Sequence, residues 1–517
     1  MHLIDLFERG LDMGGDAACL IEPGGRTLTY AEVSALSHRV ANGLHAAGIQ
    51  TGENVALLSP NHILSFVAVL GTVRSRGVWM PVNARNAIDE NINILVSGDC
   101  RFLFIHSDFA GDLPRICAAL PELKGIVCID TALESAPELE EWAMRQSETC
   151  VLAEGQPSDV VAIKGTGGTT GQSKGVLFTH RMYATLYANW LAAMPVVGRP
   201  VHLVVAPLTH AAGTVVFSTL AYGGSNIILG STQPDDILGA IAKYRVTQLF
   251  LPPTLIYRLL SSPRVREYDY SSLKYFVYSA APMSVDRLKE ALDIFGPVMV
   301  QCYGQAEAPF IVTCMSADDH ATALETGKLK RLASCGRPSP FIRAEIMGPG
   351  GEILGSNQKG EIVVRGDMVT AGYYKNPEAS RDALRGGWLH TGDVGYRDED
   401  GYFYIVDRMK DIIISGGFNI LPGEIEQVLW GHPAVADCAV IGVPHDIWGE
   451  AVKAVIELRP GIDWDPDEIL AFCRERLGPM KTPKSIEAWD VLPRSPVGKV
   501  LKKEIREEYW KDRNRKV

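Results

Sequence analysis

Residues 166–175 combine glycine, threonine and lysine in a pattern typical of an anion-binding loop. The segment reads TGGTTGQSKG and follows a strand-like run at 160–163. Glycines let backbone amides approach an anion, threonine hydroxyls can donate to its oxygens, and Lys174 adds a positive charge. The Walker pattern needs Ser or Thr directly after the lysine, and the dinucleotide pattern needs glycine where Thr170 stands, so both fail. The segment predicts a phosphate loop, with a flexible Gly/Thr linker as the plain alternative.

Six further segments carry polar residues and glycines in short runs. They are 207–213 (PLTHAAG), 303–307 (YGQAE), 387–393 (GWLHTGD), 407–411 (DRMKD), 415–420 (SGGFNI) and 493–499 (PRSPVGK). Together with the phosphate loop they resemble, in order, the motifs of the adenylate-forming superfamily, which includes 4-chlorobenzoate and medium-chain acyl-CoA ligases. One such motif is weak, but seven in family order over nearly the whole chain leave little room for coincidence.

The resemblance implies an enzyme that converts a carboxylic acid into an acyl-AMP with ATP and Mg²⁺ and then into a thioester with CoA. A carboxylate that attacks a phosphate brings anions together, so the site must supply positive charge and aligned donors. The residues that the resemblance assigns to ATP and AMP are Thr166, Gly167, Gly168, Thr169, Thr170, Gly171, Lys174, Tyr303, Gly304, Asp393 and Arg408.

Three of these residues have a stated chemical role. Asp393 can accept hydrogen bonds from both ribose hydroxyls, Arg408 can reach the same sugar, and Tyr303 offers a ring face to adenine. Glu307 is suited to holding Mg²⁺, a hard cation that takes oxygen ligands. Taken singly, Tyr303 would be core, Arg408 an interdomain ion pair and Glu307 a solvated glutamate.

The expected catalytic residues are Lys499, Glu307 and His210. Lys499 corresponds to the lysine that bridges the acid and the α-phosphate, although a lone lysine in a Pro/Gly loop is usually solvated. The resemblance implies that a small C-terminal domain rotates about Lys410 after pyrophosphate leaves. Gly416 and Gly417 then line the tunnel for the CoA thiol, and a plain turn is the alternative.

Three positions depart from the family pattern. Gly167 replaces a serine, Ser173 a proline and Ala306 a threonine. The first removes a hydroxyl from the phosphate cradle, the second loosens the loop, and the third deletes a hydrogen bond to the α-phosphate. Each lost bond is worth roughly 1 to 2 kcal/mol. We expect an enzyme that is slower or differently tuned, and not inactive.

The acid is expected beside a second set of residues, most of them small or apolar. They are His210, Phe250, Ala280, Ala281, Gly304, Pro309 and Phe310. Such a lining suits an apolar ligand with few polar anchors, and ordinary core packing is the alternative for each residue. Phe310 can shorten the pocket. We expect an aryl or arylpropenoic acid in preference to a medium-chain fatty acid, and no amino acid.

These residues need a scaffold of strands that alternate with helices. Short β-branched runs at 54–58, 78–82, 102–105, 126–129, 201–206, 226–229, 248–251, 275–278 and 298–301 are separated by helical patterns. The alternation predicts an α/β fold with largely parallel sheets. Between 335 and 365 Gly/Pro turns separate short strands, which predicts a small β-rich unit.

The expected domain organisation has two parts. Residues 1–406 form the N-terminal adenylate-forming domain, 407–411 the hinge, and 412–517 a mobile α+β C-terminal domain that carries the catalytic lysine. The length of 517 residues is compatible with several subdomains.

Composition excludes several other classes. The chain has 61 acidic and 50 basic residues, a net charge of −11, which argues against nucleic acid as a partner. Its ten cysteines are scattered singly, and no run is long and apolar enough to cross a bilayer. We expect a cytoplasmic enzyme, monomer or homodimer, with no integral membrane segment.

The sequence leads to an AMP-forming carboxylic acid:CoA ligase. Two alternatives stay open: a stand-alone adenylation protein that loads a carrier protein, and a non-catalytic adenylate-binding protein. The second is motivated by the three departures from the family pattern.

Overall fold

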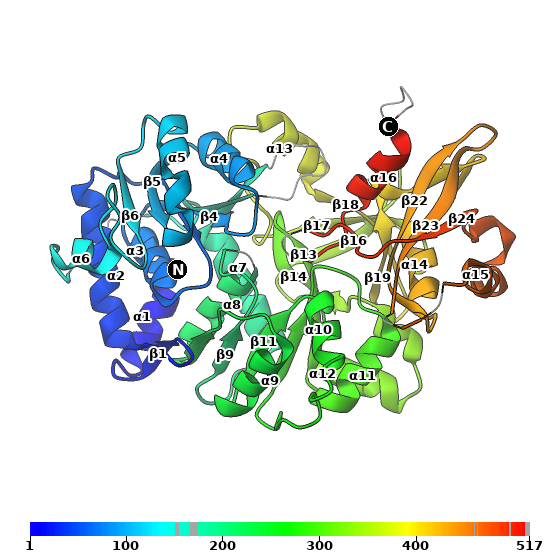
Figure 1. Cartoon of the computed structure of the whole chain (residues 1–517), viewed down its shortest axis with the longest axis horizontal. Coiled ribbons are helices and arrows are strands. Elements are labelled where there is room, and N and C mark those ends of the chain that lie inside the picture. Colours follow the sequence, from blue (N-terminus) through cyan, green and yellow to red (C-terminus); the bar gives the residue numbers. More distant parts are fainter. Residues whose placement is uncertain are drawn as a thin grey trace.

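The computed structural model of the chain describes residues 1–149, 155–165, 174–209, 211–459, 461–462, 464–495 and 498–511. Over these residues the polypeptide forms a large body with three β-sheets, followed by a smaller unit built on a fourth sheet at one end of the molecule (Figure 1). The strand that ends the large body runs through Asp407 and Arg408.

A six-stranded sheet lies in the N-terminal part of the large body, in the order β6-β5-β3-β4-β7-β8. Its strands are β3 (Asn54–Ser59), β4 (Val78–Asn83), β5 (Cys100–Ile105), β6 (Gly125–Cys128), β7 (Val160–Gly165) and β8 (Gly175–Thr179). All neighbours are parallel except β7 and β8, which form an antiparallel hairpin around the phosphate loop.

The second sheet has nine strands in the order β15-β14-β13-β12-β11-β9-β10-β1-β2. They are β1 (Ala18–Ile21), β2 (Thr27–Thr29), β9 (Val201–Val204), β10 (Ser225–Ile228), β11 (Gln248–Leu251), β12 (Tyr275–Tyr278), β13 (Met299–Gln305), β14 (Ala308–Met315) and β15 (Arg337–Pro338). Its centre is parallel, whereas β2, β14 and β15 are antiparallel. The predicted α/β class is therefore confirmed, while β14 was not predicted because it continues from β13 through a tight turn.

Helices fill the space between the two sheets and cover their outer faces. The inner helices are α1 (Asp5–Asp12), α2 (Tyr30–Ala46), α3 (Ile63–Arg74), α7 (His180–Ala193) and α8 (Ala211–Leu220), and α6 (Leu139–Met144) packs on α2. α4 (Ile88–Ser97), η1 (Ser107–Asp112) and α5 (Leu113–Ala119) lie on the outer side of the first sheet. α9 (Pro234–Lys243), α10 (Pro253–Leu260), α11 (Val285–Phe295) and α12 (Ala317–Glu325) cover the second. Every residue of α3 is buried, as expected for a helix between two sheets.

A four-stranded antiparallel sheet closes the large body. It consists of β16 (Arg343–Met347), β17 (Gly360–Arg365), β18 (Leu389–Arg397) and β19 (Phe403–Arg408), with α13 (Pro377–Ala383) and η3 (Arg385–Gly387) in the β17–β18 connection. This is the predicted β-rich unit, extended to Arg408.

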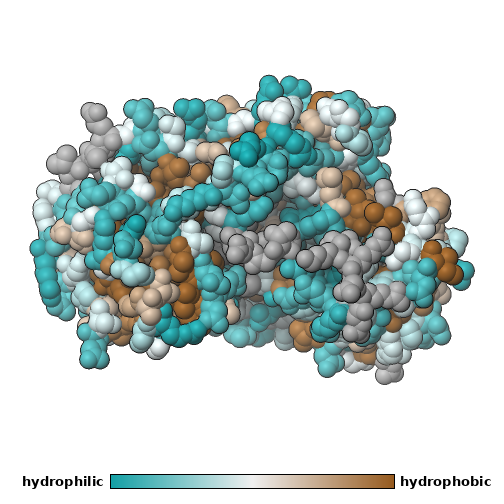
Figure 2. Space-filling view, turned by 90° about the horizontal axis from the view of Figure 1, so that it is seen from above, coloured by the Kyte–Doolittle hydropathy of each residue, from teal (hydrophilic) through white to brown (hydrophobic). Residues whose placement is uncertain are grey.

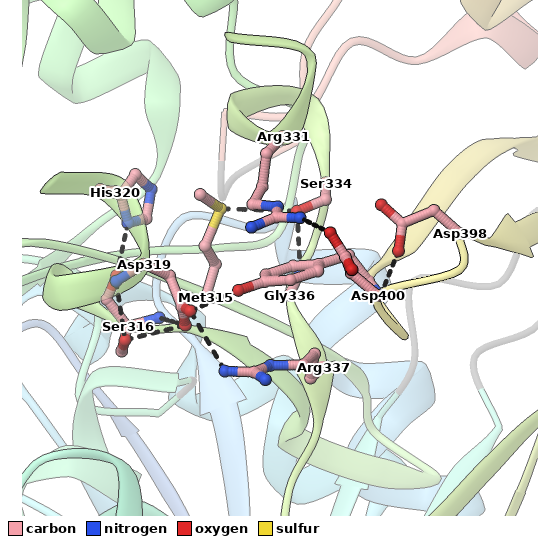
Figure 3. A network of polar contacts seen from close by, with 11 residues as sticks. Met315, Ser316, Asp319, His320, Arg331, Ser334, Gly336, Arg337, Asp398 and Asp400 are labelled. Carbon is pink, nitrogen blue, oxygen red and sulfur yellow. Dashed lines mark hydrogen bonds and ion pairs between the residues drawn. The ribbon is translucent and has the colours of Figure 1, made fainter. Parts of the chain in front are cut away.

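A polar network joins this sheet to the nine-stranded one (Figure 3). Arg331 of η2 (Leu329–Ala333) pairs with Asp400 in the β18–β19 turn. Tyr402 donates to Asp319 of α12, and Arg337 of β15 pairs with the same carboxylate at 3.3 Å. These contacts fix the β18–β19 hairpin against the sheet that carries β13.

The smaller unit is an α+β domain with its own core. It contains β20 (Ile413–Ser415), β21 (Phe418–Ile420), β22 (Val435–His445), β23 (Gly449–Leu458) and β24 (Ser485–Ala488), with α14 (Pro422–Trp430), α15 (Pro466–Lys481) and α16 (Lys502–Trp510). Its apolar cluster includes Ile413, Ile425, Leu429, Val440 and Ile456, all at most 1% exposed. The short helix η4 (Met409–Asp411) connects it to β19.

The surface of the molecule is mostly hydrophilic on the face drawn in Figure 2, with separate hydrophobic patches. Over the described residues, no helix is both long and apolar enough to cross a membrane. The nine described cysteines form no disulfide.

Candidate active site

The ends of the phosphate loop are held together at the tip of the six-stranded sheet. Residues 166–173, which include the expected binding residues Thr166 to Gly171, lie outside the described residues. Gly165 and Gly175 pair at the end of the β7–β8 hairpin. Lys174 lies directly before β8, and its Nζ is 5.1 Å from the ring centre of Tyr373.

Glu307 lies in the tight turn between β13 and β14, in which Gln305 pairs with Ala308. Its side chain is 8% exposed and accepts a hydrogen bond from Tyr373 Oη, 2.6 Å from Oε1. Because Lys174 packs on the same tyrosine ring, Tyr373 connects the end of the phosphate loop to Glu307. No group of three or more metal-ligating side chains occurs among the described residues. A single carboxylate fits Mg²⁺ that takes its remaining oxygens from nucleotide phosphates and water.

Asp393 lies on β18 directly opposite Arg408 on β19. It is 4% exposed, accepts from Tyr303 Oη at 2.7 Å, and pairs with Arg408 Nε at 3.1 Å. Arg408 therefore pairs across two strands of one sheet, and not between domains. The contact with Tyr303 joins β13 to the four-stranded sheet. Burial of Tyr303, only 8% exposed, raises the pKa of its hydroxyl well above the usual value, and the neighbouring Asp393 adds to that shift.

The C-terminal loop places Lys499 near Asp393 and Arg408. Its carbonyl accepts from Ser495 N at 2.7 Å. At the preceding Gly498, φ is +86° and an added Cβ would lie 2.6 Å from Thr254 Oγ1 of α10, so the loop touches the large body there. Glycine is needed for both reasons.

The charge environment of Lys499 is mixed. Its pKa is lowered to about 8: the surrounding protein atoms are the largest cause, Arg408 and Lys410 act in the same direction, and Asp393 and Asp411 oppose them. Its side chain nevertheless remains exposed. Three cations, Arg408, Lys410 and Lys499, thus converge near Asp393, an arrangement that suits a polyanion.

A cleft of about 570 Å³ lies between Lys174, at the end of the phosphate loop, and the start of β18. Its lining includes Lys174, Tyr373, Thr391 and Met409, together with residues of α13. None of the described residues expected to bind the acid lines it, so we assign this cleft to the approach to the phosphate loop and not to the acid pocket.

The residues expected around the acid gather at the carboxyl ends of β11, β12 and β13. Phe250 and Phe310 lie edge to face with their ring centres 5.1 Å apart, and Trp190 of α7 contacts Phe310 at the same separation. Ala280, after β12, and Phe310 have φ of 75° and 64°, a left-handed conformation that is rare for residues with a side chain and is often found at functional sites.

The remaining expected residues are Gly304, Ala281, Pro309 and His210. An added Cβ at Gly304 would lie 2.5 Å from Phe310 N, so glycine there permits the close approach of β13 and β14. Ala281 and Pro309 lie beside Ala280 and Phe310 in the chain, Ala281 partly exposed and Pro309 buried. His210 lies outside the described residues.

Gly416 and Gly417 form the exposed turn between β20 and β21, with φ of 57° and 84°. Two successive left-handed residues are typical of a two-residue hairpin turn, so the turn alone accounts for both glycines. Lys410 is in η4, and burial and the nearby Arg408 lower its pKa.

The structure thus brings Lys174, Tyr303, Glu307, Asp393, Arg408 and Lys499 to one region, from segments that span most of the chain. Sequence reasoning missed Tyr373 and Trp190. Both are aromatic residues in regions without a recognised motif, and only their neighbours in space give them a role.

Comparison with known families identifies the two units. Residues 7–374 match the family described as AMP-binding enzyme, and residues 424–499 match the AMP-binding enzyme C-terminal domain. The chain belongs to the AMP-binding enzyme family. A feruloyl-CoA synthase from Amycolatopsis sp is 38% identical over 95% of this chain and 96% of its own length. The medium/long-chain-fatty-acid–CoA ligase FadD8 from Mycobacterium tuberculosis is 34% identical over 96% of this chain and 88% of its own length.

Solved structures of AMP-binding enzymes agree with the arrangement of the two units. ATP-bound MatB from Rhodopseudomonas palustris has a TM-score of 0.89, with 30% identity and 99% of each chain covered. Apo MatB has the same identity and coverage but a TM-score of 0.79. The chain is therefore more similar in overall arrangement to the ATP-bound structure than to the apo structure.

These findings confirm the expected identity of the chain as an adenylate-forming enzyme of the acyl- and aryl-CoA ligase type. It is an AMP-forming acid:CoA ligase that uses ATP and CoA.

Proposed function

We propose that this AMP-binding enzyme activates an aryl or arylpropenoic acid with MgATP and transfers the acyl group to CoA. The observation that carries the choice of acid is the edge-to-face arrangement of Phe250, Phe310 and Trp190 at the end of the expected pocket. An aromatic ring gains packing and quadrupole interactions from such rings that an alkyl chain does not. The similarity to a feruloyl-CoA synthase supports the same choice.

In the adenylation step the acid carboxylate attacks the α-phosphate and pyrophosphate leaves. Lys499 donates to the carboxylate and the α-phosphate, Lys174 and the phosphate loop hold the departing phosphates, and Asp393 accepts from the ribose hydroxyls in place of Tyr303. Glu307, oriented by Tyr373, would hold Mg²⁺, which neutralises phosphate charge when bound.

In the second step the CoA thiol attacks the acyl carbonyl, and AMP is the leaving group. We assign residues 1–406 to the adenylate-forming domain, 407–411 to the hinge and 412–517 to a domain that rotates between the steps. Lys499 lies near Asp393 and Arg408 in this structure, and Gly416 and Gly417 lie in an exposed turn. A rotation of the small domain that moves Lys499 away and brings Gly416 and Gly417 to its place would let these glycines line the path of the CoA thiol.

The test is a CoA-dependent AMP-release assay over benzoates, cinnamates and medium-chain fatty acids. We expect the highest kcat/KM for a cinnamate or benzoate. A medium-chain fatty acid as the best substrate would overturn the proposed acid class.

A carrier protein as acceptor is the second candidate, because a fatty acid–[acyl-carrier-protein] ligase from Streptomyces coeruleorubidus is 31% identical over 95% of this chain. Comparing thioester formation on CoA and on a carrier protein decides between them. An adenylate-binding protein without activity would bind ATP but show no pyrophosphate exchange with any acid.

A further inference from the structure

Lys164 lies inside the large body among aromatic rings and has no acidic partner among the described residues. It is the penultimate residue of β7 and precedes the phosphate loop. Its Nζ lies 4.8 Å from the ring centre of Phe178, 5.1 Å from that of Trp79 and 5.5 Å from that of Tyr183. It donates a hydrogen bond to Thr214 Oγ1 at 3.2 Å. Burial lowers the pKa of Lys164 to about 7.

The register of the six-stranded sheet explains why these groups meet. Trp79 of β4 and Phe178 of β8 both pair with Ala162 of β7, and Lys164 lies two residues further along the same strand. Side chains two residues apart in a strand point to one face. That face packs on α7 and α8, the helices between the two large sheets.

Two polar groups of the rings around Lys164, the aromatic cage, have no hydrogen-bond partner among the described residues. Trp79 Nε1 and Tyr183 Oη make no hydrogen bond among the described residues, although the two side chains are only 2% and 1% exposed. A buried polar group without a partner is destabilising, so both groups would gain from a ligand that accepts hydrogen bonds. Lys164 itself is partly exposed. The cage is rich in donors and poor in acceptors.

α7 links the cage to the expected acid pocket. Tyr183 lies beside Lys164, and Trp190, two helical turns or roughly 10 Å further along, contacts Phe310. Between them, Tyr187 Oη donates to the carbonyl of Thr214 at 2.7 Å. The separation is close to the length of a small aromatic acid.

We propose that Lys164, Trp79 and Tyr183 form a subsite for an oxygen atom at the far end of the acid, remote from the carboxylate that is adenylated. The oxygen belongs to a ring hydroxyl or to a second carboxylate, and both would satisfy the unpartnered donors. This subsite rests on the proposed function, because it would bind the end of the acid that is remote from the carboxylate. A site built to hydrogen-bond a substrate group discriminates strongly against an analogue that lacks it.

The experiment measures kcat/KM for 4-hydroxycinnamate, 4-carboxycinnamate and 4-methylcinnamate in the wild-type enzyme and in Lys164→Met. We expect the wild type to prefer at least one oxygen-bearing acid over 4-methylcinnamate by at least about tenfold. Lys164→Met removes that preference and changes kcat/KM for 4-methylcinnamate by less than about threefold. The hydroxyl and carboxylate probes show whether the oxygen is neutral or anionic.

Three controls keep the outcome decisive. Lys243→Met removes an exposed lysine that lies 5.0 Å from the ring centre of Tyr244, and should leave the preference unchanged. Trp79→Phe keeps Lys164, removes one unpartnered donor and should reduce the preference severalfold, which tests the subsite even if Lys164→Met fails to fold. Thermal melting establishes folding of each variant.

The subsite and the proposed function fail in different ways. Equal loss for all three acids, or a preference that persists in Lys164→Met and Trp79→Phe, would show that the cage is structural. Activation of the three acids without distinction by the wild type would also overturn the subsite while leaving the ligase intact. Failure of every cinnamate in the wild type would overturn both the acid class and the subsite.

Discussion

At the scale of single residues, the chemistry depends on which charges meet around Asp393. In the described structure Tyr303 and Arg408 occupy its two carboxylate oxygens. A ribose that binds Asp393 must therefore share these oxygens with Tyr303 and Arg408 or replace one of them. Sequence predicted the three residues separately, but not that Tyr303 donates to Asp393, because a motif does not specify which segments become neighbours.

Lys499 gives the prediction that belongs to this scale. Its ammonium must be protonated to bridge two anions, and its pKa is lowered to about 8 by the surrounding protein, with Arg408 and Lys410 adding to this and Asp393 and Asp411 opposing it. The charged form is lost as pH rises through this value. We therefore expect kcat/KM for adenylation, measured by pyrophosphate exchange, to fall above about pH 8.

Two variants check this assignment. Lys499→Ala should lower the adenylation rate by a factor on the order of 10² to 10³. Lys499→Arg keeps its charge throughout this range, so its residual activity should show no fall near pH 8. A wild-type profile that stays level up to pH 10 would contradict the role of Lys499.

At the scale of elements, an ion pair between Lys359 and Glu424 joins the two units. Lys359, just before β17, pairs with Glu424 of α14, and Glu424 also pairs with Lys481 of α15 within the small domain. Burial alone would raise the pKa of Glu424, but the hydrogen bonds from both lysines hold it below the usual value. Only the contact with Lys359 depends on the position of the small domain.

Lys359→Gln should therefore weaken the adenylation arrangement, and Lys481→Gln is its matched control. Because such partly exposed pairs contribute about 0.2 to 1 kcal/mol, we expect Lys359→Gln to slow adenylation roughly two- to fivefold relative to thioester formation. Lys481→Gln should leave that ratio unchanged. The two half-reactions are measured separately by rapid quench, and an identical ratio in both variants would argue against the cross-domain pair.

At the scale of the whole molecule, the two units have separate apolar cores. The cluster around Ile413, Leu429 and Val440 contains no residue of the large body. The main link between them is β19 followed by η4, together with surface contacts such as the Gly423 amide on Asp407. This organisation permits one body to move as a unit against the other.

A chain that ends at Asp411 tests this independence. We expect it to fold and to bind ATP, since the phosphate loop, Glu307, Asp393 and Arg408 all remain. It should adenylate at least about 10²-fold more slowly, because it lacks Lys499. Circular dichroism, nucleotide binding and pyrophosphate exchange measure the three properties. An unfolded product would show that the large body needs the small domain as part of its fold.

The sequence by itself determined the class of fold, the order of the motifs and the identity of most polar site residues. Hydrophobic periodicity and motif spacing are properties of the chain that survive without knowledge of its partners, so the strands at 248–251 and 275–278 were predicted with the bounds they have. Only the tertiary structure decided that Tyr373 donates a hydrogen bond to Glu307 and that Trp190 packs edge to face on Phe310. It also decided that Lys164 lies among aromatic rings. Each of these contacts depends on the order of strands in a sheet and on helices packed between two sheets. Such long-range packing is not encoded in any short segment.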